Sequence, residues 1–175
     1  GTDHLDTDYL EQQNIQYANA PGCNAKSVVD YVLSCLLVLQ ERKQKNWQDF
    51  SVGIVGVGSV GGMLHDTLTA LGMTVVAYDP NVSEYSDQEN KERVWQQDVV
   101  TLHTPIIKQG EHATYHLVDK ARLEAMKPDA CLINSCRGAV IDNQALVVHL
   151  SQNPNFNVIL DVYEQEPSPS DELMK

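Results

Sequence analysis

Basic residues are scarce in this 175-residue chain, which has 12 lysines and arginines against 24 aspartates and glutamates and a formal net charge of −12. This acidic balance opposes nonspecific binding to nucleic acids and anionic membranes, so neither is expected as a partner. No apolar run approaches the roughly 20 residues needed to span a bilayer, and the first residues form no basic or apolar leader. Apolar residues still make up 42% of the chain, which is enough for a globular core.

Cysteine is also sparse, and its spacing matches none of the common zinc patterns. The thiols stand at Cys23, Cys35, Cys131 and Cys136, with no C-x-x-C pair. His112 and His116 have a spacing that suits a metal on a helix, but their glycine and polar neighbours indicate a loop, so no metal site is expected. Without a secretion signal, we expect reduced thiols and a cytoplasmic protein.

From residue 50 onward, short apolar segments alternate with helical ones. The segments predicted as strands are residues 52–55, 74–78, 99–102, 130–133 and 158–160. Nearly continuous apolar strands separated by helices are typical of a parallel sheet covered on both faces. We therefore predict an α/β fold, a Rossmann-type doubly wound parallel sheet.

The residues before this region predict two further elements. Residues 25–44 carry valines and leucines at helical spacing and indicate a long helix. Its apolar stripe is wide enough to contact a second subunit or another domain, and the two alternatives are about equal. Residues 10–17 are expected to hold one short strand, with Ile15 and Tyr17 on one face.

The strongest single motif is a glycine loop, G-x-G-x-x-G at residues 56–61, which directly follows the first predicted strand and opens a helix. Gly56 permits the tight turn, Gly58 lets a pyrophosphate approach the backbone, and Gly61 allows close packing of helix on strand. The backbone amides of Ser59 and Val60 are the expected phosphate donors. The loop therefore predicts a dinucleotide-binding site.

Asp79 ends the second predicted strand, close to the roughly 20 residues after the loop at which a carboxylate binds the adenosine ribose. Such a carboxylate accepts hydrogen bonds from the ribose hydroxyls and repels a 2′-phosphate. No basic residue follows at once, since Pro80 and Asn81 come next. The sequence therefore predicts NAD as cofactor rather than NADP.

Further polar residues follow the other predicted strands: His103, Thr104 and Pro105, then Ser135, Cys136 and Arg137, and finally Asp161. Ligands of open α/β sheets lie beyond the carboxyl ends of the strands, so these residues are expected near the dinucleotide. Arg137 could hold a substrate carboxylate by a two-pronged contact, and Glu166 could orient and charge-stabilise a histidine. Taken alone, Arg137 also fits a strand-end salt bridge, and Glu166 fits a solvated loop residue.

Together these motifs resemble the D-2-hydroxyacid dehydrogenase family over essentially the whole chain. The similarity lies in the glycine loop, Asp79 and residues 103–105, 134–142 and 160–167. It implies that Arg137 binds the substrate carboxylate and that Glu166 pairs with a catalytic histidine, which takes the hydroxyl proton while a hydride leaves C2 for NAD. By the same resemblance, Asp79, Thr104, Asp161 and residues 135–137 touch NAD.

One residue of the family pattern has no match in this sequence. The family's catalytic histidine lies downstream of Glu166, whereas no histidine follows His149 and the sequence ends at Lys175. By this resemblance we expect the catalytic histidine beyond Lys175. The chain is therefore expected to be an internal piece of a longer protein and to be inactive by itself.

The same resemblance predicts how the chain is divided. Residues 1–20 would be the end of a substrate domain and its connection. Residues 21–175 would be an NAD-binding Rossmann domain with a linking helix at about 25–44, truncated before the catalytic histidine. The full-length protein would be a homodimer.

Residues 21–31, 110–117 and 137–143 are similar to one branch of the family, which acts on a small phosphorylated hydroxyacid. Another branch, of phosphoglycerate, glyoxylate or D-lactate type, would share the sheet but have a shorter loop around residue 110. An NAD-sensing interaction protein would keep the fold without turnover. A methyltransferase can also carry a glycine loop and a following acid, but it would need neither Arg137 nor Glu166.

Overall fold

The computed structural model describes residues 5–167, 171 and 173. Its helices are α1 (Thr7–Gln12), α2 (Ala25–Lys43), α3 (Ser59–Ala70), α4 (Gln88–Arg93), α5 (Lys120–Ala125) and α6 (Asn143–Gln152). Its strands are β1 (Val52–Val55), β2 (Val75–Tyr78), β3 (Val99–Leu102), β4 (Cys131–Asn134) and β5 (Asn157–Leu160). Each predicted strand is present within one residue of its expected ends.

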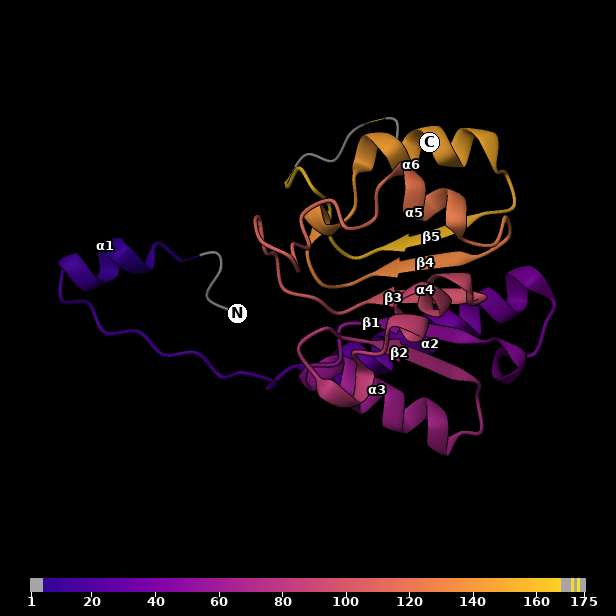
Figure 1. Ribbon diagram of the computed structural model, residues 1–175, viewed down its shortest axis with the longest axis horizontal. Helices are drawn as coiled ribbons and strands as arrows, with labels where there is room; N and C mark the ends of the chain where they lie inside the picture. Colours follow the sequence, from indigo (N-terminus) through magenta and orange to yellow (C-terminus); the bar gives the residue numbers. More distant parts are fainter. Residues whose placement is uncertain (1–4, 168–170, 172, 174–175) are drawn as a thin grey trace.

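The strands form one parallel sheet in the order β2-β1-β3-β4-β5. Val52 of β1 pairs with Val75 on one side and with Val99 on the other, and Val99 in turn pairs with Cys131. The carboxyl ends of the strands therefore lie along one edge, which faces residues 5–21, here called the N-terminal arm (Figure 1). This topology confirms the predicted parallel sheet and gathers the residues that follow each strand.

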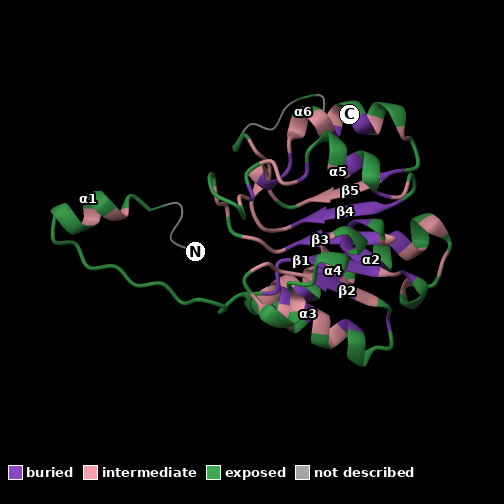
Figure 2. Cartoon of the chain, viewed as in Figure 1, coloured by how far each residue is buried: buried purple, intermediate pink, exposed green. Residues whose placement is uncertain are grey.

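Helices cover both faces of the sheet, and each face has its own apolar core (Figure 2). Helices α2 and α3 pack on the face that carries Ile54 and Ile133. Helices α5 and α6, with the 3-10 helix η3 (Val94–Gln96), cover the face that carries Val100 and Leu132. Successive strand residues point to opposite faces, so a strand buried on both sides must be apolar throughout. The doubly wound architecture predicted from the apolar strands is therefore confirmed.

Helix α2 matches the predicted long helix and ends one residue earlier, at Lys43. One side of it is buried against the sheet, whereas Leu37 and Val38 remain 49% and 50% exposed. The helix thus has apolar surface beyond what the sheet covers. Within the described residues, no helix is both long and apolar enough to cross a membrane.

The strand predicted over residues 10–17 is wrong. Asp6 caps helix α1 by accepting a hydrogen bond from the Tyr9 amide, and the helix continues through Gln12. The residues after it run as an exposed arm in which Ile15 and Tyr17 have no neighbouring strand in the described part of the chain. A strand needs a partner for its backbone hydrogen bonds, and the alternation of side chains alone supplies none.

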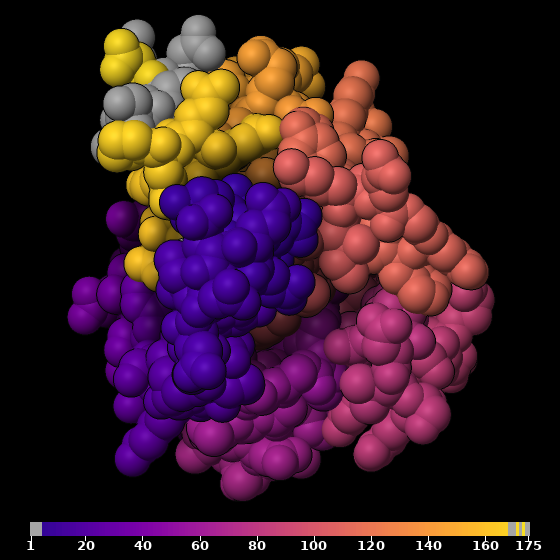
Figure 3. Space-filling view, turned by 90° about the vertical axis from the view of Figure 1, so that its left-hand side faces the viewer, coloured from indigo at the N-terminus to yellow at the C-terminus, as the bar shows by residue number. Residues whose placement is uncertain are grey.

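The arm stands in front of the carboxyl edge of the sheet (Figure 3). No residue of α1 is buried. The arm joins the body through Gly22, which has φ +75°. A Cβ added at Gly22 would lie 3.1 Å from Oγ of Ser59, so the arm meets the body beside the glycine loop.

Candidate functional site

The glycine loop connects β1 to α3, and two of its glycines are required by close backbone packing. Gly56 has φ +91°, and a Cβ there would lie 2.7 Å from the carbonyl oxygen of His103. A Cβ on Gly61 would lie 1.9 Å from the carbonyl oxygen of Gly56. By contrast, a Cβ on Gly58 would have no heavy atom within 4 Å, so the backbone there borders open space.

Helix α3 begins next to this space. Its N-cap is Gly58, which has no side chain to cap the helix, and its first turn contains no acidic residue. The first amides of a helix lack partners within the helix and carry the positive end of its dipole. Ser59 is exposed and Val60 half-buried at this end. The space beside Gly58 is therefore suited to an anionic group such as a pyrophosphate.

Asp79 follows β2, and its carboxylate holds two segments of backbone. Oδ2 accepts a hydrogen bond from the amide of Val57 at 2.8 Å, and Oδ1 accepts one from the amide of Asn81 at 2.9 Å. Each carboxylate oxygen has a second lone pair for a further donor. The side chain is thus part of the glycine loop's own structure, a role that the sequence pattern does not reveal.

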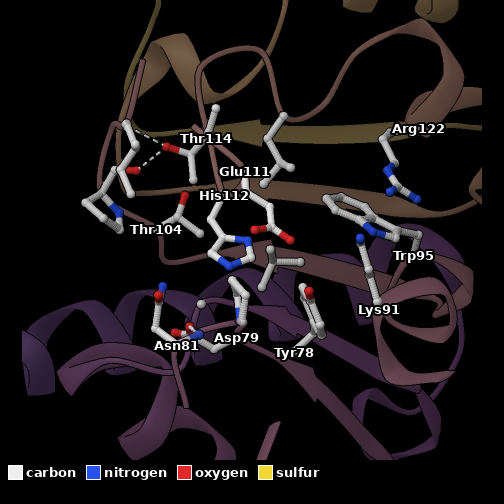
Figure 4. Close-up of a pocket in the computed structure, with 17 residues that line it drawn as sticks. Tyr78, Asp79, Asn81, Lys91, Trp95, Thr104, Glu111, His112, Thr114 and Arg122 are labelled. Atoms are coloured by element: carbon white, nitrogen blue, oxygen red, sulfur yellow. Dashed lines mark hydrogen bonds between the residues drawn. The ribbon is translucent and has the colours of Figure 1, made fainter. Parts of the chain in front are cut away.

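A cavity of about 130 Å³ opens beside Asp79 (Figure 4). Val55, Gly56, Tyr78 and Trp95 line it from the body of the fold, and Thr104 and Pro105 border it after β3. Glu111 and His112 form another wall, with the imidazole of His112 pointing toward Asp79 (Figure 4). Neither of these two loop residues directly follows a strand, so the strand-end rule does not predict them.

The cavity wall formed by the loop is held by Thr114, whose hydroxyl donates to the carbonyl of Pro105 at 2.6 Å. The same oxygen accepts from the amide of Ile107 at 2.7 Å. This pair of bonds fixes the path of the long polar loop at residues 105–115. Loop length is the only sequence signal that could have directed attention to this wall.

Lys91 and Arg122 add positive charge to the opposite side of the same cavity. Arg122 Nη1 lies 3.0 Å from Glu92 Oε2, and its guanidinium lies 5.4 Å from the ring centroid of Trp95. The cavity is therefore flanked by a carboxylate on the sheet edge and by cations farther out. These cations follow no strand, so the rule that predicts the other site residues does not include them.

The predicted residue His103 lies at the end of β3, but its ring is engaged with the sheet. Its Nε2 lies 3.0 Å from Oγ1 of the fully buried Thr101. Burial lowers the pKa of His103 to about 4, so the ring is uncharged at neutral pH. Its carbonyl, by contrast, borders Gly56. The backbone of His103 thus borders the glycine loop, whereas its half-buried side chain contacts Thr101 of the sheet.

The turn after β4 is organised by the fully buried Asn134. Its Nδ2 donates to the carbonyl of Arg137 at 3.0 Å, and its Oδ1 accepts from the Cys136 amide at 3.1 Å. Arg137 Nη1 donates to the carbonyl of Cys136 at 2.7 Å. Burial raises the pKa of the Cys136 thiol, which favours a protonated packing residue over a reactive thiolate.

Two hydroxyls at this edge are buried without a hydrogen-bond partner among the described residues, namely Oγ of Ser135 and Oγ1 of Thr104. Buried polar atoms in folded proteins nearly always have partners, so such orphans favour a site completed by a polar ligand. Together with the open space at Gly58 and the carboxylate of Asp79, they fit a bound dinucleotide.

The segment after β5 lies against the turn after β4 that carries Arg137, here called the Arg137 turn. A Cβ on Gly138 would lie 1.9 Å from the carbonyl carbon of Tyr163, so the two segments meet backbone to backbone. The exposed Asp161 donates its amide to the carbonyl of Asn134 at 3.0 Å. The fold thus brings together the two segments that carry the predicted catalytic residues.

Glu166, the second of these residues, is exposed, and its Oε1 accepts a hydrogen bond from the Tyr163 amide at 2.9 Å. The catalytic histidine that Glu166 is expected to support lies, by prediction, beyond Lys175. Lys175 itself lies outside the described residues. The structure therefore places Glu166 near the Arg137 turn, and its pairing with a histidine stays a prediction.

Comparison with known proteins shows which family the chain belongs to. Residues 38–175 match the family described as "D-isomer specific 2-hydroxyacid dehydrogenase, NAD binding domain". The chain is 46% identical over 179 residues to the erythronate-4-phosphate dehydrogenase of Escherichia coli O17:K52:H18, covering all of this chain and 47% of that protein. The erythronate-4-phosphate dehydrogenase of Shewanella violacea is 44% identical, with 99% of this chain and 46% of that protein covered.

The fold is likewise similar to solved dehydrogenase structures. A D-lactate dehydrogenase from Aquifex aeolicus, complexed with NAD and lactic acid, matches with a TM-score of 0.75 and 25% identity. That match covers 99% of this chain and 62% of the other. The chain spans about half the length of the curated relatives that it matches. It belongs to the D-isomer specific 2-hydroxyacid dehydrogenase family, as the NAD-binding domain.

Proposed function

We propose that the protein is an NAD-dependent dehydrogenase that oxidises 4-phospho-D-erythronate to 2-oxo-3-hydroxy-4-phosphobutanoate. The observation that carries this proposal is identity of about 45%, along the whole chain, to relatives named erythronate-4-phosphate dehydrogenase. In the reaction, C2 loses a hydride and its hydroxyl loses a proton, so that the products are the 2-oxo acid, NADH and H⁺. We propose that the reaction serves pyridoxal phosphate biosynthesis in the cytoplasm.

Arg137 is the proposed ligand of the substrate carboxylate, since its guanidinium can bind a carboxylate by two parallel hydrogen bonds. Glu166 is proposed to support the protonated form of a catalytic histidine contributed from beyond Lys175. NAD⁺, when bound, supplies the hydride acceptor. The residues proposed to contact it are Gly56, Gly58, Ser59, Val60, Gly61, Asp79, His103, Thr104, Pro105, Ser135, Cys136, Arg137 and Asp161.

The charges at the site support separate groups for the cofactor and for the substrate. We propose that the carboxylate of Asp79 favours ribose hydroxyls over a 2′-phosphate and that Arg137, at a different strand end, binds the substrate. Besides Arg137 we expect no cluster of cations for the substrate phosphate in these residues, so we propose that this phosphate is bound by the remainder of a longer protein. We also propose that this longer protein is a homodimer and that the present residues alone do not turn over substrate.

The test is an assay of NADH formation by the protein at the full length of its relatives. 4-Phospho-D-erythronate is the test substrate, and unphosphorylated erythronate and 3-phosphoglycerate are the controls. Turnover with the first alone supports the proposal. Turnover with another hydroxyacid instead would assign a different dehydrogenase, and clear NADH binding without any turnover would favour the NAD-sensing interaction protein.

A further inference from the structure

His116 connects the long loop to the segment that carries Glu166. Its Nε2 lies 2.6 Å from Oε1 of Glu164, a short hydrogen bond between residues 48 positions apart in the sequence. The two side chains are 31% and 21% exposed, so both are partly shielded from water. A hydrogen bond to a charged group in such surroundings is stronger than one between neutral groups.

The backbone of His116 has an unfavourable conformation. Its φ is +53°, in the left-handed region that non-glycine residues rarely adopt. Its amide donates to the carbonyl of Ala139 at 2.9 Å, and its ring stacks on Tyr115 with centroids 4.0 Å apart. Backbone outliers of this kind persist where the surrounding structure over-determines them, and they cluster at functional sites.

Glu164 lies where three segments meet. Besides His116, its carboxylate accepts a hydrogen bond through Oε2 from the amide of Asn143, the first residue of α6, at 3.3 Å. Its own amide nitrogen lies 2.4 Å from the position that a Cβ on Gly138 would occupy. The side chain thus joins the long loop and the start of α6 to a segment that already touches the Arg137 turn.

We propose that His116 and Glu164 are positioning residues of the dehydrogenase, which hold the Arg137 turn and the Glu166 segment in one geometry. The inference rests on the proposed function. Neither side chain is assigned a contact with substrate or cofactor, and neither lines the cavity beside Asp79. Their effect is exerted on the distance and direction between the group that binds the carboxylate and the group that supports the catalytic histidine. Small misplacements of such groups reduce the rate of the chemical step strongly.

The test uses the full-length protein with the variants His116→Ala, His116→Gln, Glu164→Gln and the double variant His116→Ala/Glu164→Gln. We expect His116→Ala to lower kcat about tenfold or more, with a smaller change in KM and an NADH dissociation constant that stays within about twofold. His116→Gln should recover part of kcat because its amide can still donate to Glu164. The effects in the double variant should fall clearly short of the sum of the single effects, since the two residues act as a pair.

Lys108→Ala is the matched control, because Lys108 is exposed in the same loop and does not line the cavity; it should keep wild-type kcat. Thermal melting accompanies every assay, and if His116→Ala does not fold, His116→Gln and Glu164→Gln decide. Normal kcat in folded His116 and Glu164 variants, or additive effects in the double variant, would overturn the inference.

A wild-type protein without turnover on 4-phospho-D-erythronate would overturn the proposed substrate instead. The positioning role would then be measured with whichever hydroxyacid the wild type oxidises. If the wild type oxidises none, the inference fails together with the proposed activity.

Discussion

The carboxylate of Asp79 accepts a hydrogen bond from the backbone amide of Val57, inside the glycine loop, at 2.8 Å. The residue proposed to choose between NAD and NADP therefore also holds the loop beside the open space at Gly58. If Asp79 binds the ribose as proposed, cofactor affinity and cofactor choice are coupled through this one side chain, because a change to the carboxylate also removes a support of the loop.

Replacing Asp79 by Asn is expected to weaken NADH binding about tenfold or more, since hydrogen bonds to a charged group are worth about 1.5–3 kcal/mol. The ratio of NADPH to NADH affinity should rise, because the negative charge that repels a 2′-phosphate is gone and Lys91 and Arg122 line the same cavity. Fluorescence titration with both nucleotides measures this ratio. Asp87→Asn, at the exposed cap of α4, is the control, and an unchanged ratio in Asp79→Asn contradicts the prediction.

The glycines of the loop and of α3 provide a graded series of alanine substitutions. Gly61→Ala should destabilise the protein by about 3 kcal/mol or more, because its Cβ would meet a backbone oxygen at 1.9 Å. Gly58→Ala should fold normally, since its Cβ would meet no heavy atom within 4 Å apart from those of its chain neighbours, yet lose NADH affinity. Gly62→Ala is the control, with a nearest atom at 3.9 Å. Urea unfolding and NADH titration separate the three outcomes, and tight NADH binding by Gly58→Ala would refute the assigned role.

His103 should make the protein less stable as the pH falls from about 6.5 toward 4. The unfolded side chain takes up a proton near its ordinary pKa of 6.5, whereas burial lowers the pKa in the folded state to about 4. The unfolded state therefore binds more protons in this window, and the shift corresponds to a loss of at most about 3 kcal/mol. His103→Gln removes this contribution, so the stability difference between wild type and variant should change between pH 7 and pH 4.5 in urea unfolding. An equal difference at both pH values would show that the prediction is wrong.

Asp98, just before β3, is expected to stabilise the folded protein from outside the functional site. Burial opposes its ionisation, but hydrogen bonds from Lys127, the Ser51 amide and Lys45 outweigh that effect and hold its pKa well below the usual range. The distances to these three donors are 2.6, 3.0 and 3.1 Å. Asp98→Ala should therefore cost about 2 kcal/mol in urea unfolding.

The control for Asp98→Ala is Asp129→Ala. The Asp129 carboxylate is 69% exposed and lies 3.6 Å from Lys43, so its loss should change stability by less than about 1 kcal/mol. Equal losses in the two variants would contradict the ranking of a multiply bonded carboxylate above an exposed one.

The strands and the edge that carries the site could be predicted because both depend on local pattern. A strand buried on both faces, such as β3, needs four consecutive apolar or small residues, and these are visible in the sequence. The rule that ligands lie beyond strand carboxyl ends then selects Asp79 and Arg137 without knowledge of their contacts. The structure brings these strand ends to one edge, as expected from the parallel order.

Contacts across long sequence separations could not be predicted in this way. The His116–Glu164 bond depends on the path of the long loop, which is set by Thr114 and by packing rather than by any periodicity. The presence of His112 in the cavity wall has the same origin. The error over residues 10–17 has a related cause, since alternation there indicates a strand but the fold offers it no partner.

Gly22 is the residue at which the N-terminal arm joins the body of the fold, beside the glycine loop. Because no residue of α1 is buried, the direction of that helix is set by the backbone torsions of the residues that connect it to the body, Gly22 among them. A rotation of a few degrees about these backbone torsions displaces α1 by a larger distance than it displaces the residues next to Gly22. Gly22 lies beside Ser59, the first residue of α3, which follows the open space at Gly58. A side chain introduced at Gly22 would therefore press on the first residue of α3, next to the open space at Gly58.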